Sequence, residues 1–140
     1  SSFNGDLSGW NVGEVTTMSY MFYEASAFNR DLSGWNVGKV TTMQQMFFFS
    51  SAFTGDDLSD WDVSAVTNMS NMFYNAELFT SDLSDWGDKV SQVDNMTAMF
   101  WGATAFLDTE PNLSSWVVTI SQPSYWGDIT NQPDWKDPIS

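Results

Sequence analysis

The chain contains no cysteine and no histidine among its 140 residues. Without cysteine it can form no disulfide bond and has no thiolate nucleophile, and without histidine it lacks the commonest general base and transition-metal ligand. Basic residues are scarce too: four lysines and arginines stand against 18 aspartates and glutamates, which leaves a net charge of −14. This charge repels phosphate backbones, so we expect no nucleic-acid partner. Because histidine and cysteine are absent, we also expect that the chain is not an enzyme.

Long apolar runs are also missing. None approaches the roughly 20 residues that cross a bilayer, and the start of the chain, SSFNGDLSGW, has neither a basic region nor an apolar one. We therefore expect no membrane insertion by this segment. Because the chain opens directly on repeated sequence without a methionine, we expect it to be part of a longer protein. Its 42% hydrophobic residues are sufficient for one compact core.

The most informative feature is an internal repeat. The motif DLSGWNV occupies residues 6–12 and returns at residues 31–37, and a second block has the form Met-x-x-Met-Phe. The first motif, in its Asp-Leu-Ser-x-Trp form, begins at Asp6, Asp31, Asp57 and Asp82, with an altered copy at Asn112. The second block begins at Met18, Met43, Met69 and Met96. A period of about 25 residues predicts a solenoid, because one copy is too short to bury its own apolar residues.

Four apolar columns recur in register and are predicted to face inward. The phenylalanine column is Phe3, Phe28, Phe53, Phe79 and Phe106. The leucine column is Leu7, Leu32, Leu58, Leu83 and Leu113, and the tryptophan column is Trp10, Trp35, Trp61, Trp86 and Trp116. The valine column is Val15, Val40, Val66 and Val93. A ladder of indoles could also bind glycans, but we favour the core interpretation for tryptophan and methionine alike.

The spacing within each repeat predicts one short helix and one short strand. Val15, Met18, Phe22 and Ala25 are spaced to share one helical face, and Thr16 precedes them as a helix cap. The Leu-Ser-x-Trp block alternates between apolar and polar residues as a strand does. The predicted fold class is therefore α/β: a leucine-rich-repeat-type solenoid with one short parallel strand and one short helix per rung of about 25 residues.

We place the repeat solenoid at residues 1–116. Its rungs lie near residues 3–27, 28–52, 53–78 and 79–105, with a partial rung at 106–116. Residues 117–140 depart from the pattern and hold three of the four prolines, so they are predicted to form an irregular C-terminal cap. The segments from Trp86 to Val93 and from Phe106 to Leu113 are longer than their counterparts, so the fourth and fifth rungs should bulge there.

Residues 28–53, FNRDLSGWNVGKVTTMQQMFFFSSAF, resemble the BspA-like leucine-rich-repeat family of bacterial surface lipoproteins and secreted protist proteins. The family repeat runs F-N-x-D-L-S-x-W-D-V-S-x-V-T-x-M-x-x-M-F-x-x-A. Four copies over about residues 3–106 are similar to it. The resemblance implies an extracellular or cell-surface protein without catalytic activity, often linked to adhesion.

The aspartate column, Asp6, Asp31, Asp57 and Asp82, has two interpretations. In the first, each carboxylate accepts backbone N–H groups from the adjacent turn, as aspartate does in Asx-turns. In the second, the column is a row of calcium sites, since calcium takes several oxygen ligands and further carboxylates stand nearby. We favour the turns, because the chain holds no known calcium-binding loop motif.

The residue after the inward phenylalanine of each second block is always aromatic. This set comprises Tyr23, Phe48, Tyr74 and Trp101. Phe49 adds an apolar residue to a column that otherwise holds Glu24, Asn75 and Gly102. Such residues at the margin of the buried face either pack at the rim or contact another chain. We keep them as candidate contact residues.

Three N-glycosylation sequons begin at Asn68, Asn95 and Asn112, and they are candidate modification sites if the protein is secreted by a eukaryote. The expected function is a non-catalytic extracellular domain that presents an interaction surface for another protein, for a further copy or for a glycan. The alternative is a structural building block of a larger extracellular assembly or filament.

Overall fold

Most of the chain is built from turns and loops. The computed structural model describes residues 2–136, and it contains the 3-10 helix η1, Ser84–Val90, and the α-helix α1, Thr104–Asp108. Apart from these two helices, the regular contacts in the described part are isolated parallel bridges. They pair Thr17 with Thr42, Thr42 with Asn68, Asn68 with Asn95, and Asn112 with Asn131.

The predicted α/β class, with a helix and a strand in every rung, is therefore wrong. The second block does not form a helix, because Tyr20 and Glu24 adopt left-handed backbone angles, with φ of 64° and 55°. Alternate N–H groups of the block donate to the next rung, and those between them close turns three residues back, so the four-residue bonds of a helix do not form. The N–H of Tyr20 reaches the Gln44 carbonyl at 3.0 Å, and that of Phe22 reaches the Met46 carbonyl at 2.9 Å. Thr16 consequently caps no helix.

The Leu-Ser-x-Trp block forms a turn instead of a strand. The N–H of Trp10 donates to the Leu7 carbonyl three residues earlier, at 3.0 Å, and Trp61 repeats the bond to Leu58 at 3.1 Å. The turn brings leucine and tryptophan to the same interior, whereas a strand would send neighbouring side chains to opposite faces. The alternating pattern that indicated a strand therefore arises from a repeated turn.

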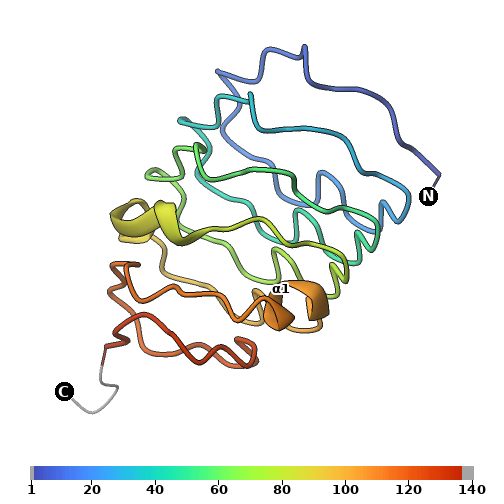
Figure 1. Cartoon of the computed structure of the whole chain (residues 1–140). Coiled ribbons are helices and arrows are strands. Elements are labelled where there is room, and N and C mark those ends of the chain that lie inside the picture. The colour runs from blue at the N-terminus through green and yellow to red at the C-terminus, as the bar shows by residue number, and fades with distance from the viewer. Residues whose placement is uncertain (1, 137–140) are drawn as a thin grey trace.

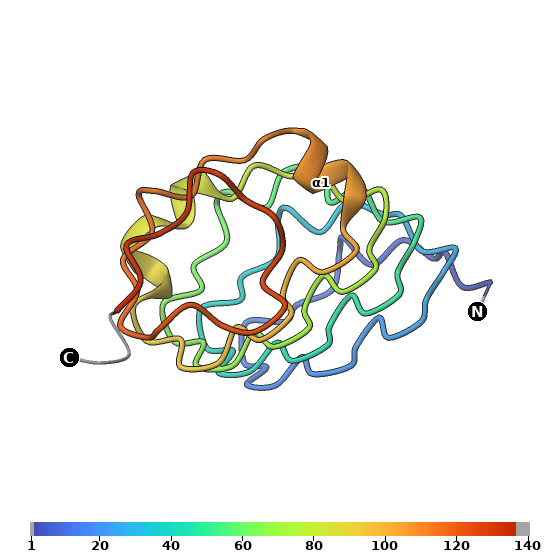
Figure 2. The same ribbon diagram turned by 90° about the horizontal axis from the view of Figure 1, so that it is seen from below.

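Successive passes of the chain nevertheless lie side by side, from the N-terminal rung to the C-terminal segment (Figures 1 and 2). Phenylalanines from both blocks of each rung stack along the interior. Phe22 stacks on Phe47 with ring centroids 5.4 Å apart, and Phe47 stacks on Phe73 at 5.5 Å. Phe53 inserts beside Phe47 at 4.2 Å. The core is thus a column of aromatic rings shared between neighbouring rungs.

The tryptophan column joins each rung to the one before it. The indole N–H of Trp35 donates to the Leu7 carbonyl at 3.0 Å, and that of Trp61 to the Leu32 carbonyl at 2.9 Å. Trp86 and Trp116 make the equivalent bonds. The predicted inward orientation holds for these four buried indoles. Trp10, in the first rung, is 57% exposed.

The two helices lie where the repeat is longer than usual. Helix η1 includes the extra residues after Trp86, and Gly87 inside it has φ of 43°, where a side chain would be strained. Helix α1 lies in the long segment before Leu113. Figure 1 shows the two helices at separate places on the outside of the stack. Both predicted bulges are therefore present: α1 occupies one, and η1, which is kinked at Gly87, occupies the other.

The C-terminal segment follows the geometry of a rung although its sequence departs from the repeat. The N–H of Ala98 donates to the Ser124 carbonyl at 2.8 Å, and that of Phe100 to the Trp126 carbonyl at 3.2 Å. Tyr125 has φ of 55°, close to the 54° of Ala98 beside it. Trp126 is buried against the ring of Phe100, at 5.0 Å. Residues 137–140 of the predicted cap lie outside the described part.

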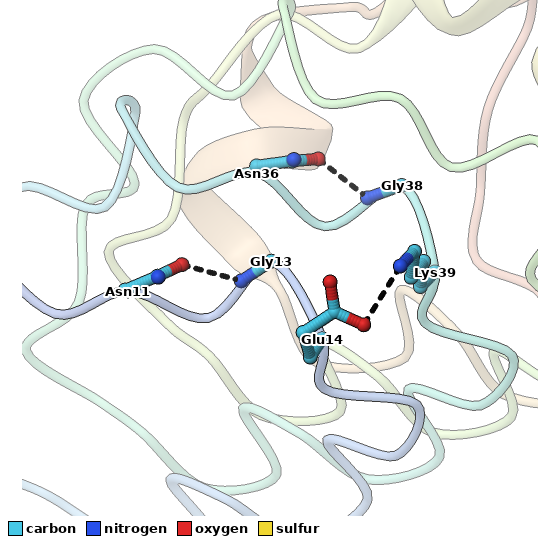
Figure 3. Close-up of polar contacts among 6 residues, drawn as sticks. All are labelled: Asn11, Gly13, Glu14, Asn36, Gly38 and Lys39. Atoms are coloured by element: carbon cyan, nitrogen blue, oxygen red, sulfur yellow. Dashed lines mark hydrogen bonds and ion pairs between the residues drawn. The ribbon is translucent and has the colours of Figure 1, made fainter.

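Polar side chains fix the turn between the two blocks. Figure 3 shows that Asn11 accepts the N–H of Gly13 at 3.1 Å and that Asn36 accepts the N–H of Gly38 at 3.0 Å. Beside them Lys39 and Glu14 form an ion pair of 2.7 Å across the two rungs. Both charged side chains are mostly exposed, so the ion pair contributes at most about 1 kcal/mol. The same turn recurs in the third rung, where Asp62 accepts the N–H of Ser64.

Candidate functional site

Five aromatic side chains gather on the outside of the first three rungs. This aromatic patch consists of Tyr20, Tyr23, Phe48, Phe49 and Tyr74. Tyr20 is 50% exposed and Tyr23 and Phe49 are each 42% exposed, while Phe48 and Tyr74 are half-buried. The structure thus places four of the predicted contact residues together, and it adds Tyr20.

Within the aromatic patch the rings stack from rung to rung. Tyr23 and Phe48 lie 5.0 Å apart with an interplanar angle of 2°, and Phe48 and Tyr74 lie 4.9 Å apart at 16°. Phe49 meets Phe48 edge-on at 4.7 Å. Because the stacked rings cover one another's faces, the patch presents mostly ring edges to its surroundings.

Phe49 holds an unusual backbone conformation. Its φ is 57°, in the left-handed region that costs a residue with a side chain roughly 1–2 kcal/mol. The other rungs place Glu24, Asn75 and Gly102 in the same column, also with a left-handed φ, so the conformation belongs to the repeat and only Phe49 fills it with an apolar ring. The ring of Phe49 packs against Phe48 and Tyr74, yet it remains 42% exposed. An exposed apolar ring in a column that is otherwise polar or glycine marks a candidate contact position.

The fifth predicted contact residue, Trp101, does not continue the stack. Its ring meets Tyr125 edge-on at 5.3 Å, and the two side chains are 45% and 67% exposed. Between this pair and Tyr74 lies a hollow of about 270 Å³. It is lined by Asn71, Tyr74, Thr97, Ala98, Trp101 and Tyr125. We call this the aromatic hollow.

Sequence reasoning missed Tyr125 as a site residue. The segment around it lacks the repeat motif, so no alignment of the copies brings Tyr125 into register with Tyr20. The backbone bonds described above do so, because they place the segment beside the fourth rung. Its only signal in the sequence was two adjacent aromatic residues, Tyr125 and Trp126, among polar ones.

Each carboxylate of the aspartate column takes part in a turn. Asp6 accepts the N–H of Ser8 at 2.9 Å, and Asp31, Asp57 and Asp82 accept the equivalent serine N–H at the same distance. The turn interpretation is therefore confirmed.

The hydrogen bonds of these turns also lower the pKa values of aspartate side chains. The backbone and hydroxyl of Ser8 lower the pKa of Asp6 below its usual 3.8, and the hydroxyl and backbone of Ser33 lower the pKa of Asp31. Asp57 and Asp62 have lowered pKa values for the same reason, through Ser59 and Ser64. Within residues 2–136 no group of three or more acidic residues is arranged to hold a metal ion. Calcium binding by the column stays a prediction without structural support.

The three sequon asparagines also take part in turns. Asn68 accepts the N–H of Ser70 at 2.9 Å, and Asn95 accepts that of Thr97 at 3.0 Å. Asn112 accepts both the N–H and the hydroxyl of Ser114, at 3.1 and 2.6 Å. Asn112 is exposed, while Asn68 and Asn95 are half-buried. Glycosylation stays a prediction for all three.

None of the helices in the described part is long and apolar enough to span a membrane. Comparison with curated proteins and with solved structures finds no match. A family model matches residues 1–116, which include every copy of the repeat. The chain therefore belongs to the family described as Mycoplasma protein of unknown function, DUF285.

Proposed function

We propose that the chain is a non-catalytic extracellular repeat domain that binds another protein through the aromatic patch. The observation that carries this proposal is the exposed, strained Phe49 at the centre of the patch. Tyrosine, tryptophan and phenylalanine are enriched at protein interfaces, where few side chains supply most of the binding energy. The edges of stacked rings offer contact area at low entropic cost, because their neighbours already hold them in place.

The surroundings of the patch favour a protein partner over a charged polymer. None of the five patch residues is charged, and the chain as a whole carries −14. The resemblance to BspA-like surface proteins supports an extracellular setting. Extracellular placement and adhesion remain our proposal.

The decisive test compares capture of purified extracellular proteins by immobilised wild type and by Phe49→Asn. Asparagine suits the left-handed backbone, as Asn75 shows in the same column, so the variant should fold. We expect it to bind its partner at least tenfold more weakly. Glu14→Gln is the matched control, since Glu14 is exposed in the first rung, is not a patch residue and pairs with Lys39. Equal capture by all three proteins would remove the patch as the binding surface.

A second function, as a building block of an assembly, is favoured by the N-terminal end of the stack. Phe3, Trp10 and Met21 are 46%, 57% and 37% exposed, whereas Met46, the counterpart of Met21, is fully buried. In this version a second copy covers that end. Sedimentation should then show association that rises with concentration and is lost in Trp10→Glu. A monomer at every concentration contradicts it.

A further inference from the structure

We infer that the aromatic hollow is a binding site for a neutral sugar residue. This site is separate from the proposed protein-binding patch. The hollow and the patch share only Tyr74. The stack of patch rings ends at Tyr74, and the next ring, Trp101, turns to Tyr125 instead. Tyr74 therefore keeps one face without a stacked ring, on the side of the hollow.

The hollow exists because of a change in side-chain size between rungs. Ala98 occupies the column in which the other rungs place Tyr20, Gln45 and Asn71, and all four share a left-handed φ between 54° and 64°. Its methyl group leaves open the space that those longer side chains fill elsewhere. At about 270 Å³ the hollow is slightly smaller than pockets for drug-sized ligands, roughly 300–1,000 Å³. It suits one ring-sized group.

Its lining combines aromatic walls with free polar groups. Tyr74, Trp101 and Tyr125 supply the rings. Within residues 2–136 neither the amide of Asn71 nor the hydroxyl of Thr97 has a hydrogen-bond partner, so both are available to a ligand. A sugar ring presents an apolar face of C–H groups and a rim of hydroxyls, which matches rings beside an amide and a hydroxyl.

The charges of the lining residues and of the whole chain limit the class of ligand further. No aspartate, glutamate, lysine or arginine lines the hollow. The net charge of −14 disfavours acidic sugars, because it repels anions. A cation would also bind aromatic rings, but here no carboxylate lines the hollow to neutralise it. Of the three ligand classes, only a neutral sugar can bind the hollow without a charged side chain in its lining.

The test applies the whole chain to an array of neutral oligosaccharides built from glucose, galactose, mannose, fucose and N-acetylglucosamine. We expect retention of at least one of them, and titration with that oligosaccharide should change tryptophan fluorescence. Trp101→Ala should lower the affinity at least tenfold, and Glu14→Gln should leave it unchanged. Tetramethylammonium chloride serves as the cationic probe.

Ala98→Asn separates binding from folding. Asparagine tolerates the left-handed backbone and already occupies this column as Asn71, so the thermal midpoint should not fall, while its side chain fills the hollow. We expect this variant to lose sugar binding at least tenfold. Binding of no oligosaccharide, unchanged binding by Ala98→Asn, or binding of tetramethylammonium alone overturns the inference. Because Ala98 is not part of the aromatic patch, protein capture by this variant tests the proposed function separately.

Discussion

Phe47 and Phe48 are neighbours in the chain, and both stack on their counterparts in adjacent rungs. Phe47 is fully buried and lies 5.4 Å from Phe22 and 5.5 Å from Phe73. Phe48 is half-buried and lies 5.0 Å from Tyr23 and 4.9 Å from Tyr74. We call the stack through Phe47 the inner ladder and the stack through Phe48 the outer ladder. The two ladders have nearly the same ring spacing on opposite sides of one backbone.

What differs is how strictly each ladder constrains its residues. The inner position is phenylalanine in all four rungs, namely Phe22, Phe47, Phe73 and Phe100. The outer position is tyrosine, phenylalanine or tryptophan. A close-packed interior penalises any change in volume, whereas a surface position needs only to remain aromatic. Identical stacking thus serves the fold inside and leaves side chains available to a partner outside.

The largest expected effect comes from truncating the two neighbours in turn. Phe47→Ala should lower the free energy of unfolding by about 3–5 kcal/mol, because it leaves a cavity among stacked rings. Phe48→Ala should cost about 1 kcal/mol, the value of an aromatic pair on a partly exposed surface. Urea unfolding followed by circular dichroism measures both. Losses of similar size would mean that the outer ladder is structural.

A second comparison separates an interior tryptophan from the exposed one. Trp61→Phe removes the buried indole bond to the Leu32 carbonyl, which still accepts the N–H of Trp35, so the variant should cost about 1–1.5 kcal/mol. Trp10→Phe removes no such bond and should change stability by less than about 0.5 kcal/mol. Thermal unfolding of the two variants supplies the measurement. If Trp10→Phe proves as costly, Trp10 is covered in solution.

The strain at Phe49 can be isolated by two truncations. Phe49→Ala and Phe49→Gly lose the same ring contacts, but only glycine relieves the left-handed backbone. We expect Phe49→Gly to be more stable than Phe49→Ala by about 1 kcal/mol, the reverse of the usual order in regular structure. Denaturant titration tests it. The usual order would show that Phe49 carries no strain.

The smallest effect concerns the exposed aspartate column. The lowered pKa of Asp31 means that the folded state binds its proton less tightly than the unfolded state. The resulting stability is present above the unfolded value near 3.8 and is lost as the pH falls through the lower folded pKa. Ser33→Ala should raise the pKa of Asp31, as carbon NMR titration can measure. An unchanged pKa would assign the shift to something other than the serine.

Several features could be predicted from the sequence because they depend on the repeated motif or on a departure from its length. The four interior tryptophans are buried as expected, and the extra residues before Val93 and Leu113 form the two helices. The aspartate turns followed from a local rule, since the Asp-x-Ser spacing closes its own hydrogen bond. The outer aromatic positions could be identified too, although their stacking could not.

The fold class could not be predicted, and Tyr20 shows why. The spacing of Val15, Met18 and Phe22 fits a helix, yet the chain turns left-handed at Tyr20 and donates its N–H to Gln44 in the next rung. A pattern of apolar residues shows which side chains turn inward. It does not show whether their backbone bonds lie four or about 25 residues away.

The sequence by itself determined the period of the repeat, the residues that fill the interior and the absence of histidine and cysteine chemistry. Only the tertiary structure decided that the rungs are turns rather than strands and helices, and that Tyr125 joins Trp101 at the aromatic hollow. The physical reason is that stacking brings carbonyl acceptors of the next rung within reach of backbone N–H groups such as those of Tyr20 and Phe22. Other N–H groups close turns three residues back within the rung, as that of Trp10 does to Leu7.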